Sequence, residues 1–341
     1  MNRLNIVHLL DDVAPGGVMQ ALAVFDLPEL AQCVTCSTMQ VNPESDSAPV
    51  LEADIVMTHF PPRWRALPFL TALKRRNPHA RLVHIEHSYT GSWEALHVEH
   101  RFRFRTMLRI AYRLFDDVIA VSQGQGHWLA QVAGCLDKRL SVIPPFSRVE
   151  GLYALPIPAW DGERPLVIGA YGRFSKEKGF SRLLAQFKTL APGRFTLLLG
   201  GGGEDEEHLQ ALGDGQDNVN FYGYVSNRAD FLSRCDVIVV PSQHESYGLV
   251  ATEARQAGRP IIVADVDGLP EQTCQGSAGI TVDFGSESAL QAALETLTPE
   301  KMQRMSQEAK LSVEGLQEQR VLAWKKLLKI ARWSQTYALA G

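Results

Sequence analysis

Apolar and polar positions alternate along the chain in a pattern that predicts parallel β-strands separated by amphipathic helices. Short β-branched or apolar runs are each followed by a stretch with helical spacing, which is typical of βαβ units. Continuously apolar strands belong to sheets that are buried on both faces. In the first half, the pattern predicts strands at 4–10, within 32–41, and at 55–58, 82–86, 118–121 and 140–143, with helices from residue 18 and near 66–76, 100–115 and 124–133.

A second series of strands follows a proline-rich stretch. Residues 144–165 read PPFSRVEGLYALPIPAWDGERP and have no helical period, so we expect an interdomain linker at 151–164. Strands are then predicted at 166–171, 195–199, 219–221, 237–240 and 261–264, and a last helix at about 318–333.

The predicted fold class is therefore α/β, with two Rossmann-like doubly wound parallel-sheet domains facing across a cleft. The first domain covers residues 1–150 and the second 165–317, and the segment 318–341 is expected to pack back toward the first. Ligands of such sheets bind beyond the carboxyl ends of the strands.

Composition narrows the class of protein. The chain has 341 residues, of which 45% are hydrophobic and 21% charged. No run of 18 apolar residues occurs and the N-terminus lacks a signal pattern, so we expect a cytoplasmic protein. The five cysteines are odd in number and scattered, and the CVTC of Cys33 and Cys36 fits a strand better than a zinc site.

Charge is unevenly distributed. The net charge is −4, yet residues 61–113 contain eleven Lys or Arg against three acids. Arg101, Arg105, Arg109 and Arg113 recur every four positions. This region fits a surface attracted to an anionic membrane or a phosphorylated acceptor, and equally a solvated helix face packed on a sheet. No nucleic-acid-binding motif accompanies the charge, so nucleic acid is not an expected partner.

Two carboxylates stand out in PSQHESYGLVATEARQAGRP, residues 241–260. We predict a helix over 247–257 with Ser246 as N-cap, which places Glu245 in the loop and Glu253 in the second turn. The free amides of the first turn lie between them and can bind phosphate. A sugar-diphosphate-nucleoside, with hydroxyls at both ends, has this shape.

A second chemical element is YGRFSKEKGF, directly after the strand LVIGAY. Arg173 and Lys178 can clamp a diphosphate, while Gly172 and Gly179 permit close approach of the backbone. The same residues also fit an ordinary surface loop with solvated charges.

Taken in order, these and other segments resemble the family 4 glycosyltransferases, which have the GT-B fold of two facing Rossmann-like domains. The resemblance covers nearly the whole chain and is most specific in the second half. Its segments are Gly16-Gly17, His59, His87, AVS at 120–122, GRFSKEKG at 172–179, GGGG at 200–203, FYGYV at 221–225, PSQHESYGLVATEA at 241–254 and DGLPE at 267–271.

The resemblance implies a donor-binding site in the second domain. Glu253 would hold the ribose hydroxyls and Glu245 the donor sugar, while Arg173 and Lys178 would neutralise the leaving diphosphate. The remaining donor-binding residues would supply loop backbone, amides or contacts to the base; they are Gly172, Tyr224, Val225, Ser246, Tyr247, Gly248 and Leu249.

The resemblance also assigns residues of the first domain. Gly16 and Gly17 would let a loop approach the diphosphate, and His87 matches the family's active-site histidine. The implied catalytic residues are thus His87, Arg173, Lys178 and Glu245. His59 is a secondary candidate, whereas His84 and Glu86 are expected to be structural.

We expect no metal and no cofactor beyond the nucleotide-diphosphate sugar as co-substrate. The sequence Asp265-Val266-Asp267 spells a DxD motif, yet it matches a donor-site loop, and two cations already face the diphosphate. The chain departs from the family pattern at Pro144-Pro145-Phe146 and at Arg255.

The predicted function is a retaining, metal-independent hexosyltransferase. It would use a UDP- or GDP-sugar and a saccharide or lipid-linked saccharide acceptor, in bacterial surface polysaccharide or glycolipid synthesis at the inner face of the membrane. The alternatives are a sugar phosphorylase or epimerase on the same scaffold, and a non-catalytic protein that binds a nucleotide or glycan.

Overall fold

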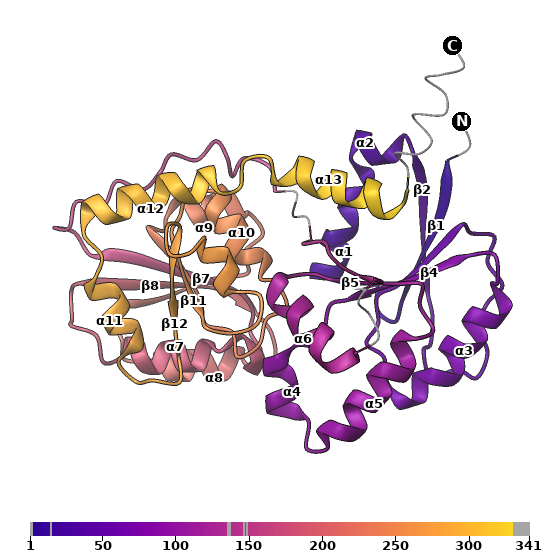
Figure 1. Cartoon of the computed structure of the whole chain (residues 1–341). Helices are drawn as coiled ribbons and strands as arrows, with labels where there is room; N and C mark the ends of the chain where they lie inside the picture. Colours follow the sequence, from indigo (N-terminus) through magenta and orange to yellow (C-terminus); the bar gives the residue numbers. More distant parts are fainter. Residues whose placement is uncertain (1–2, 14–15, 135–137, 146, 148, 330–341) are drawn as a thin grey trace, which may run out of the picture. The chain divides into compact units, whose positions relative to one another are not determined.

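The computed structural model describes residues 3–13, 16–134, 138–145, 147 and 149–329 (Figure 1). These residues form two compact units. The first contains the described residues up to 147 together with 315–329, and the second contains 149–314. Each unit has a six-stranded sheet in which all pairs of strands are parallel.

The sheet of the first unit has the strand order β2-β1-β3-β4-β5-β6. Its strands are β1 (Leu4–Leu10), β2 (Val34–Gln40), β3 (Ile55–Thr58), β4 (Arg81–Glu86), β5 (Asp117–Ala120) and β6 (Leu140–Val142). The helices of this unit are α1 (Gly17–Leu22), α2 (Pro28–Ala31), α3 (Leu67–Arg76), α4 (Gly91–His97), α5 (Arg101–Tyr112), α6 (Gln123–Ala133) and α13 (Leu316–Leu327), with 3-10 turns at Ala23–Asp26 and Trp64–Ala66.

Helices cover both faces of this sheet, because successive side chains of a strand point to opposite sides. Leu9 and Leu82 belong to the apolar cluster formed with α3, α5 and α6. On the other face, His8 lies 5.1 Å from the ring of Phe25, which in turn lies 4.9 Å from Trp324 of α13. Helix α13 also packs against α2, so the described end of the chain belongs to the first unit.

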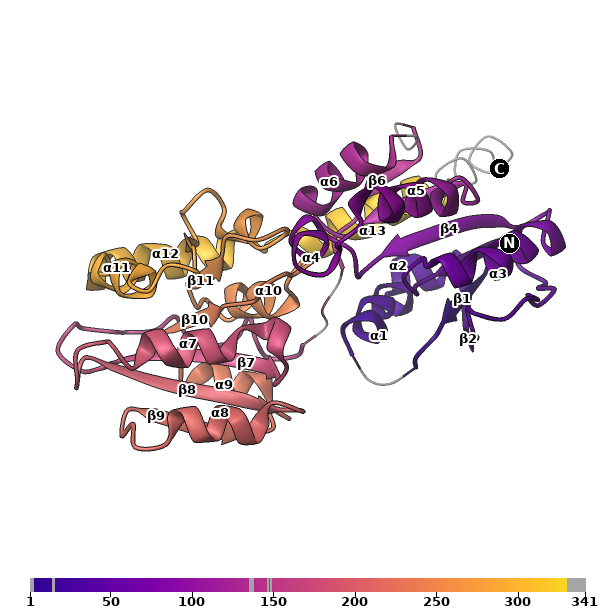
Figure 2. The same ribbon diagram turned by 90° about the horizontal axis from the view of Figure 1, so that it is seen from below.

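The second unit repeats this design with the strand order β12-β11-β10-β7-β8-β9. Figure 2 labels the strands of this sheet from β11 through β10, β7 and β8 to β9. Its strands are β7 (Leu166–Arg173), β8 (Phe195–Gly202), β9 (Val219–Gly223), β10 (Val237–Val240), β11 (Ile261–Ala264) and β12 (Gly279–Val282). Its helices are α7 (Phe180–Phe187), α8 (Glu206–Gly213), α9 (Arg228–Ser233), α10 (Leu249–Gln256), α11 (Ala289–Glu295) and α12 (Pro299–Leu311), with 3-10 turns at Lys176–Lys178 and Pro270–Thr273.

The fold class predicted from the sequence, two doubly wound parallel sheets, is confirmed. Every predicted strand is present, while β12, α4, α11 and α12 lie in segments for which no element was predicted. Leu152, from the stretch 151–164, is fully buried in the core of the second unit, so that stretch packs onto this unit. Positions 330–341 of the predicted C-terminal segment and Phe146 lie outside the described residues.

One local prediction was wrong. Helix α10 begins at Leu249, and its N-cap is Gly248 rather than Ser246. Gly248 has φ +89, a left-handed conformation that residues with a side chain rarely adopt, and a Cβ there would lie 2.6 Å from Leu269. Backbone conformation and packing therefore set the start of this helix, not the capping preference of serine.

Candidate active site

The two charged motifs of the second unit meet at the carboxyl edge of its sheet. Strands β7 and β10 are neighbours, and the loops that follow them touch. The Gln243 amide N–H donates to the Glu177 carbonyl oxygen at 2.8 Å, and Gln243 Nε2 donates to the Lys176 carbonyl oxygen at 2.7 Å. A Cβ at Gly179 would lie 2.0 Å from the carbonyl oxygen of Pro241, so only glycine permits this approach.

Glu245 is held at both its side chain and its backbone. Its Oε2 accepts hydrogen bonds from Lys178 Nζ at 2.6 Å and from Ser242 Oγ at 3.3 Å. Its amide N–H donates to Asp267 Oδ2 at 3.1 Å, and its carbonyl oxygen accepts from the Gly268 amide at 3.1 Å. Within the described part of the chain, no group donates to Oε1, which leaves this oxygen available to a ligand hydroxyl.

Backbone amides lie beside this ion pair. No described residue accepts a hydrogen bond from the amides of Gly248 and Leu249 at the start of α10. Amides of a first helical turn that lack a partner are a favourable place for an anion, because the helix dipole adds partial positive charge there. Tyr247, the preceding residue, is buried, and its carbonyl oxygen accepts from Gln272 Nε2 at 3.0 Å.

Glu253 has a different setting, since its side chain is only 2% exposed. Its Oε2 accepts from the Tyr171 hydroxyl at 2.6 Å and forms an ion pair with Arg228 Nε at 3.2 Å. Burial and the neighbouring carboxylate raise the pKa of Tyr171 well above its usual value, so this hydroxyl stays a donor.

The sequence did not assign roles to Tyr171 and Arg228. Tyr171 lies in the quoted motif YGRFSKEKGF, but nothing in its spacing pointed to a residue 82 positions away. Arg228 follows the predicted base-binding segment by three positions, and only the packing of α9 brings it to Glu253.

The other predicted donor-binding residues are more open. The side chain of Arg173 is 74% exposed, and its Nη2 lies 3.8 Å from Glu177 Oε1, so this cation is only weakly paired. Gly172 precedes it within β7. Tyr224 is 81% exposed after the edge strand β9, and Val225 packs partly onto the core.

In the first unit, His87 directly follows β4 and is half-buried. The preceding residue, Glu86, anchors its loop: Glu86 Oε1 accepts from the amides of Ser88 and Tyr89 at 2.8 and 2.9 Å. The Tyr112 hydroxyl donates to Glu86 Oε2 at 2.6 Å. Burial lowers the pKa of His87 to about 4. The charge of Glu86 acts in the opposite direction and raises this pKa, whereas His84 lowers it further. His87 is therefore a neutral imidazole at pH 7.

His87 contacts a second histidine. Its Nε2 lies 3.1 Å from Nδ1 of His59, which directly follows β3 and is itself buried. Gly16 and Gly17, in contrast, are exposed at the start of α1 and have no positive φ. The loop before them includes residues 14 and 15, which lie outside the described residues.

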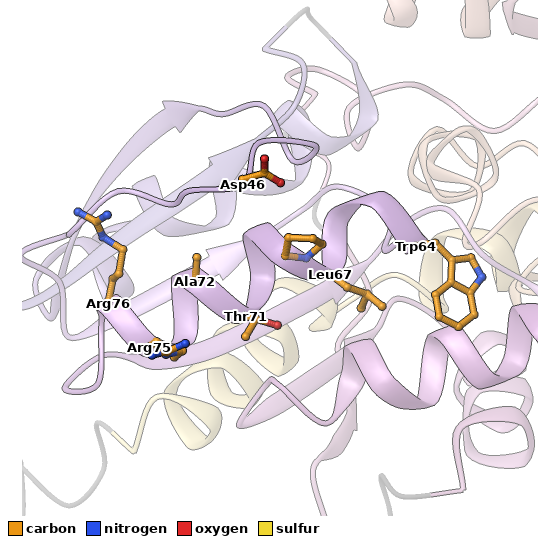
Figure 3. Close-up of a pocket in the computed structure, with 8 residues that line it drawn as sticks. Asp46, Trp64, Leu67, Thr71, Ala72, Arg75 and Arg76 are labelled. Carbon is orange, nitrogen blue, oxygen red and sulfur yellow. The ribbon is translucent and has the colours of Figure 1, made fainter.

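Two hollows occur on the first unit. One, of about 590 Å³, lies at the carboxyl ends of β1–β3 and has a mixed lining, whose polar members are Asp11, Gln40, Asn42, Glu44 and Arg63. The other, of about 750 Å³, runs along α3, with Trp64 at one end and Arg75 and Arg76 at the other (Figure 3). Neither contains a residue that was predicted to bind the donor.

The described residues contain no group of three or more His, Cys, Asp or Glu side chains arranged to hold a metal ion. Among them, likewise, no helix combines the length and the apolar character needed to cross a bilayer.

Two family models match the chain. Residues 48–149 match the model described as Glycosyltransferase Family 4, and residues 159–312 match Glycosyl transferases group 1. The chain belongs to the family 4 glycosyltransferases, which have the GT-B fold.

The chain is also similar to curated proteins, among them a glycosyltransferase and a sugar-phosphate synthase. The chain is 34% identical over 164 residues to the lipopolysaccharide core biosynthesis glycosyltransferase LpsD of Rhizobium meliloti, covering 46% of this chain and 47% of that protein. It is 29% identical over 222 residues to the mannosylfructose-phosphate synthase of Agrobacterium fabrum, covering 58% and 49%. The chain thus spans about half the length of these curated relatives.

Solved structures share the fold. The sucrose-phosphate synthase of Thermosynechococcus elongatus is 20% identical, with a TM-score of 0.72 over 97% of this chain and 100% of that one. Anabaena HepE, solved in complex with UDP and glucose, is 18% identical, with a TM-score of 0.71 over 97% and 100%.

Proposed function

We propose that this protein is a retaining glycosyltransferase that moves a hexose from a nucleotide-diphosphate sugar to a saccharide or lipid-linked saccharide. The observation that carries the proposal is the arrangement at the carboxyl edge of the second sheet. There the Lys178–Glu245 ion pair lies in the loops beside the α10 N-terminus, where the Gly248 and Leu249 amides have no described acceptor. A cation and helix-terminal amides suit an anionic diphosphate, and a carboxylate suits sugar hydroxyls.

The proposed chemistry is the departure of a nucleoside diphosphate from the anomeric carbon. Lys178 has three N–H donors and gives one to Glu245, so two remain for phosphate oxygens. Arg173, which is exposed and weakly paired, can add a second cation. Stabilising charge that develops on a leaving group is worth about 3 kcal/mol for each fixed donor.

Glu245 is proposed to orient the donor sugar through its available Oε1. Glu253 is proposed to bind the ribose, with Tyr171 and Arg228 holding its carboxylate in place. Tyr224 and Val225 would receive the base. Retention would follow from attack on the same face, assisted by the leaving phosphate, because no residue of the site is proposed as a covalent nucleophile.

The donor is proposed to be a UDP- or GDP-sugar, and UDP is favoured because HepE, of similar fold, was solved with UDP and glucose. The hollow at the ends of β1–β3 offers carboxylate, amide and guanidinium groups to the hydroxyls of a saccharide acceptor. A thermal-shift screen of UDP, GDP, ADP and TDP sugars tests the donor, since a ligand of the native state raises its Tm.

We also propose a cytoplasmic location with peripheral contact to anionic lipid through residues 61–113. The exposed Phe102 and Trp64, with Arg103 5.9 Å from the Trp64 ring, support such a surface. Part of the basic charge is already paired within the unit, as in Arg105–Glu94 and Lys74–Asp116. Liposome sedimentation that does not depend on anionic lipid content would contradict this contact.

The experiment that tests the function is Glu245→Ala, with transfer measured from the donor found in the screen. We expect a loss of turnover of at least about a hundredfold with the Tm retained, as for loss of one group that stabilises the transition state. Glu207→Ala, at an exposed glutamate of α8, is the matched control and should leave turnover unchanged. Unchanged turnover in Glu245→Ala would overturn the site assignment.

Product analysis separates the mechanisms. NMR of the product should show the anomeric configuration of the donor; an inverted configuration would exclude retention. Activity that requires free phosphate as acceptor would identify a phosphorylase instead. Binding of a nucleotide sugar without any turnover would identify a non-catalytic protein.

A further inference from the structure

Three histidines form a continuous hydrogen-bonded chain in the first unit. His8 Nδ1 lies 3.0 Å from His59 Nε2, and His59 Nδ1 lies 3.1 Å from His87 Nε2. The three residues belong to, or directly follow, β1, β3 and β4, which are consecutive neighbours in the sheet. The chain therefore runs across the sheet from a buried end at His8 to a half-buried end at His87.

All three rings are neutral near pH 7. Burial lowers the pKa of His8 and of His87 to about 4, and it lowers that of His59 well below its usual value. A neutral imidazole has one N–H and one lone pair, on different nitrogens. Each ring in the chain therefore has one proton to place.

Only two arrangements of these protons satisfy both hydrogen bonds. If His59 is protonated on Nδ1, it donates to His87 Nε2 and accepts from His8 Nδ1–H. His87 then has its proton on Nδ1. If His59 is protonated on Nε2, every proton in the chain moves to the opposite nitrogen, and His87 Nδ1 becomes an acceptor. The tautomers of the three rings are thus coupled.

The buried end of the chain distinguishes these arrangements. His8 Nε2 is buried and has no hydrogen-bond partner among the described residues. In the first arrangement this nitrogen has only an unused lone pair, whereas in the second it is an N–H donor without an acceptor. Buried donors that lack a partner are rarer in proteins than acceptors that lack one, which favours the first arrangement.

We propose that His8 and His59 are positioning residues that hold His87 in its Nδ1–H tautomer. No described residue hydrogen-bonds His87 Nδ1, so this nitrogen is available as a neutral donor to a substrate oxygen. The effect on turnover rests on the proposed function, since it requires His87 to face substrate. The tautomer itself does not depend on that function and can be measured separately.

The first test is a long-range ¹H–¹⁵N correlation spectrum of the wild-type protein, labelled at histidine and assigned through His87→Gln. The His87 ring should give one protonated-type nitrogen at Nδ1 and one unprotonated-type nitrogen at Nε2. The reverse assignment, or shifts averaged between the two types, would overturn the proposal.

The second test compares two substitutions of His59. In His59→Asn, the amide N–H takes the place of Nδ1 and can still donate to His87, whereas His59→Leu removes the donor. We expect His59→Asn to keep the wild-type ¹⁵N pattern and most of kcat. For His59→Leu we expect averaged or reversed shifts and a loss in kcat of about tenfold, the worth of about one hydrogen bond, with the donor KM little changed. The Tm checks that both variants fold.

The outcomes separate this proposal from the function. A His59→Leu protein that folds and keeps the wild-type tautomer overturns the proposal, whatever its activity. A changed tautomer with unchanged kcat supports the coupling of the three rings but overturns the donor role of His87. Absence of turnover in the wild-type protein contradicts the proposed function and leaves the tautomer measurement decisive for the histidine chain.

Discussion

The two units present polar groups at the carboxyl ends of their strands in different chemical states. The first unit places neutral imidazoles there, linked from His8 through His59 to His87. The second places charges there, as in the Lys178–Glu245 pair. Neutral rings can donate or accept hydrogen bonds without attracting an anion, whereas the charged edge suits a diphosphate. The comparison shows how one fold, used twice, can provide two kinds of chemistry.

The two edges also differ in how their charge state is maintained. In the first unit, burial keeps the histidines neutral and lowers the pKa of His8 and His87 to about 4, so near neutral pH only the unfolded chain takes up protons at these positions. In the second, Lys178 and Glu245 form an ion pair at 2.6 Å and hold each other in place. Substitutions should therefore affect the second edge mainly through lost charge, and pH should affect mainly the first.

The largest expected effect is on the charged edge, through Lys178→Met. Removing the cation should lower kcat by at least about a hundredfold, because it takes away charge that would face the leaving diphosphate. Lys176→Met is the matched control: this exposed lysine lies in the same loop and forms no ion pair with a described residue, so its kcat should change little. Equal losses in the two variants would indicate a general effect of loop charge.

The next effect is structural and concerns the contact between the two motifs. Gly179→Ala places a Cβ 2.0 Å from the Pro241 carbonyl at φ +71, and should destabilise the protein by about 3 kcal/mol from backbone strain plus overlap. Gly215→Ala has nearly the same φ, +72, with no atom within 4 Å, and should cost about 1 kcal/mol. Urea unfolding measures the loss in the free energy of unfolding for each variant. Similar losses would mean that backbone strain accounts for the effect and that the overlap with Pro241 contributes little.

A pH change tests the neutral edge. The pKa values of His8 and His87 are about 4 in the folded protein, against 6.5 unfolded. Below pH 6.5 the unfolded chain therefore binds protons at these positions that the folded state does not. The contribution of the two histidines to the free energy of unfolding is fully present above pH 6.5 and is lost as the pH falls toward 4. Between pH 7 and pH 6 we expect a loss of about 1.4 kcal/mol from these two histidines.

The control for this loss is His8→Asn, which removes one of the two groups whose pKa is about 4 in the folded protein. Its loss of stability over the same pH step, measured by urea unfolding at each pH, should be smaller than that of the wild type by about 0.7 kcal/mol. If the free energy of unfolding changed with pH as much in His8→Asn as in the wild type, the pKa of His8 would not be lowered in the folded protein.

The smallest expected effect concerns the buried carboxylate of the second unit. Tyr171→Phe removes a donor to Glu253 and should cost about 1 kcal/mol, since Arg228 remains as a partner. Tyr222→Phe is the control, because its hydroxyl bonds Asp230 at the same 2.6 Å but lies closer to solvent, and it should cost less. A larger loss at Tyr222 would contradict the importance of burial at Glu253.

Much of the fold could be predicted from the sequence because buried parallel strands are continuously apolar. Runs such as VIVV of β10 and IIVA of β11 stand out in any local window. Strand β12 was missed because GITV is short and follows the largely polar stretch EQTCQGSA. The start of α10 was misplaced because the φ of Gly248 and its contact with Leu269 depend on packing.

The sequence by itself determined the two sheets, the charged loops and the family to which the chain belongs. Only the tertiary structure decided which side chains meet. His8, His59 and His87 are separated by 51 and 28 positions, and they touch because β1, β3 and β4 are adjacent in the sheet. The partners of Glu253 likewise depend on how β7 and α9 pack around α10. Local sequence sets the period of an element, whereas strand order and packing set the partners of each side chain.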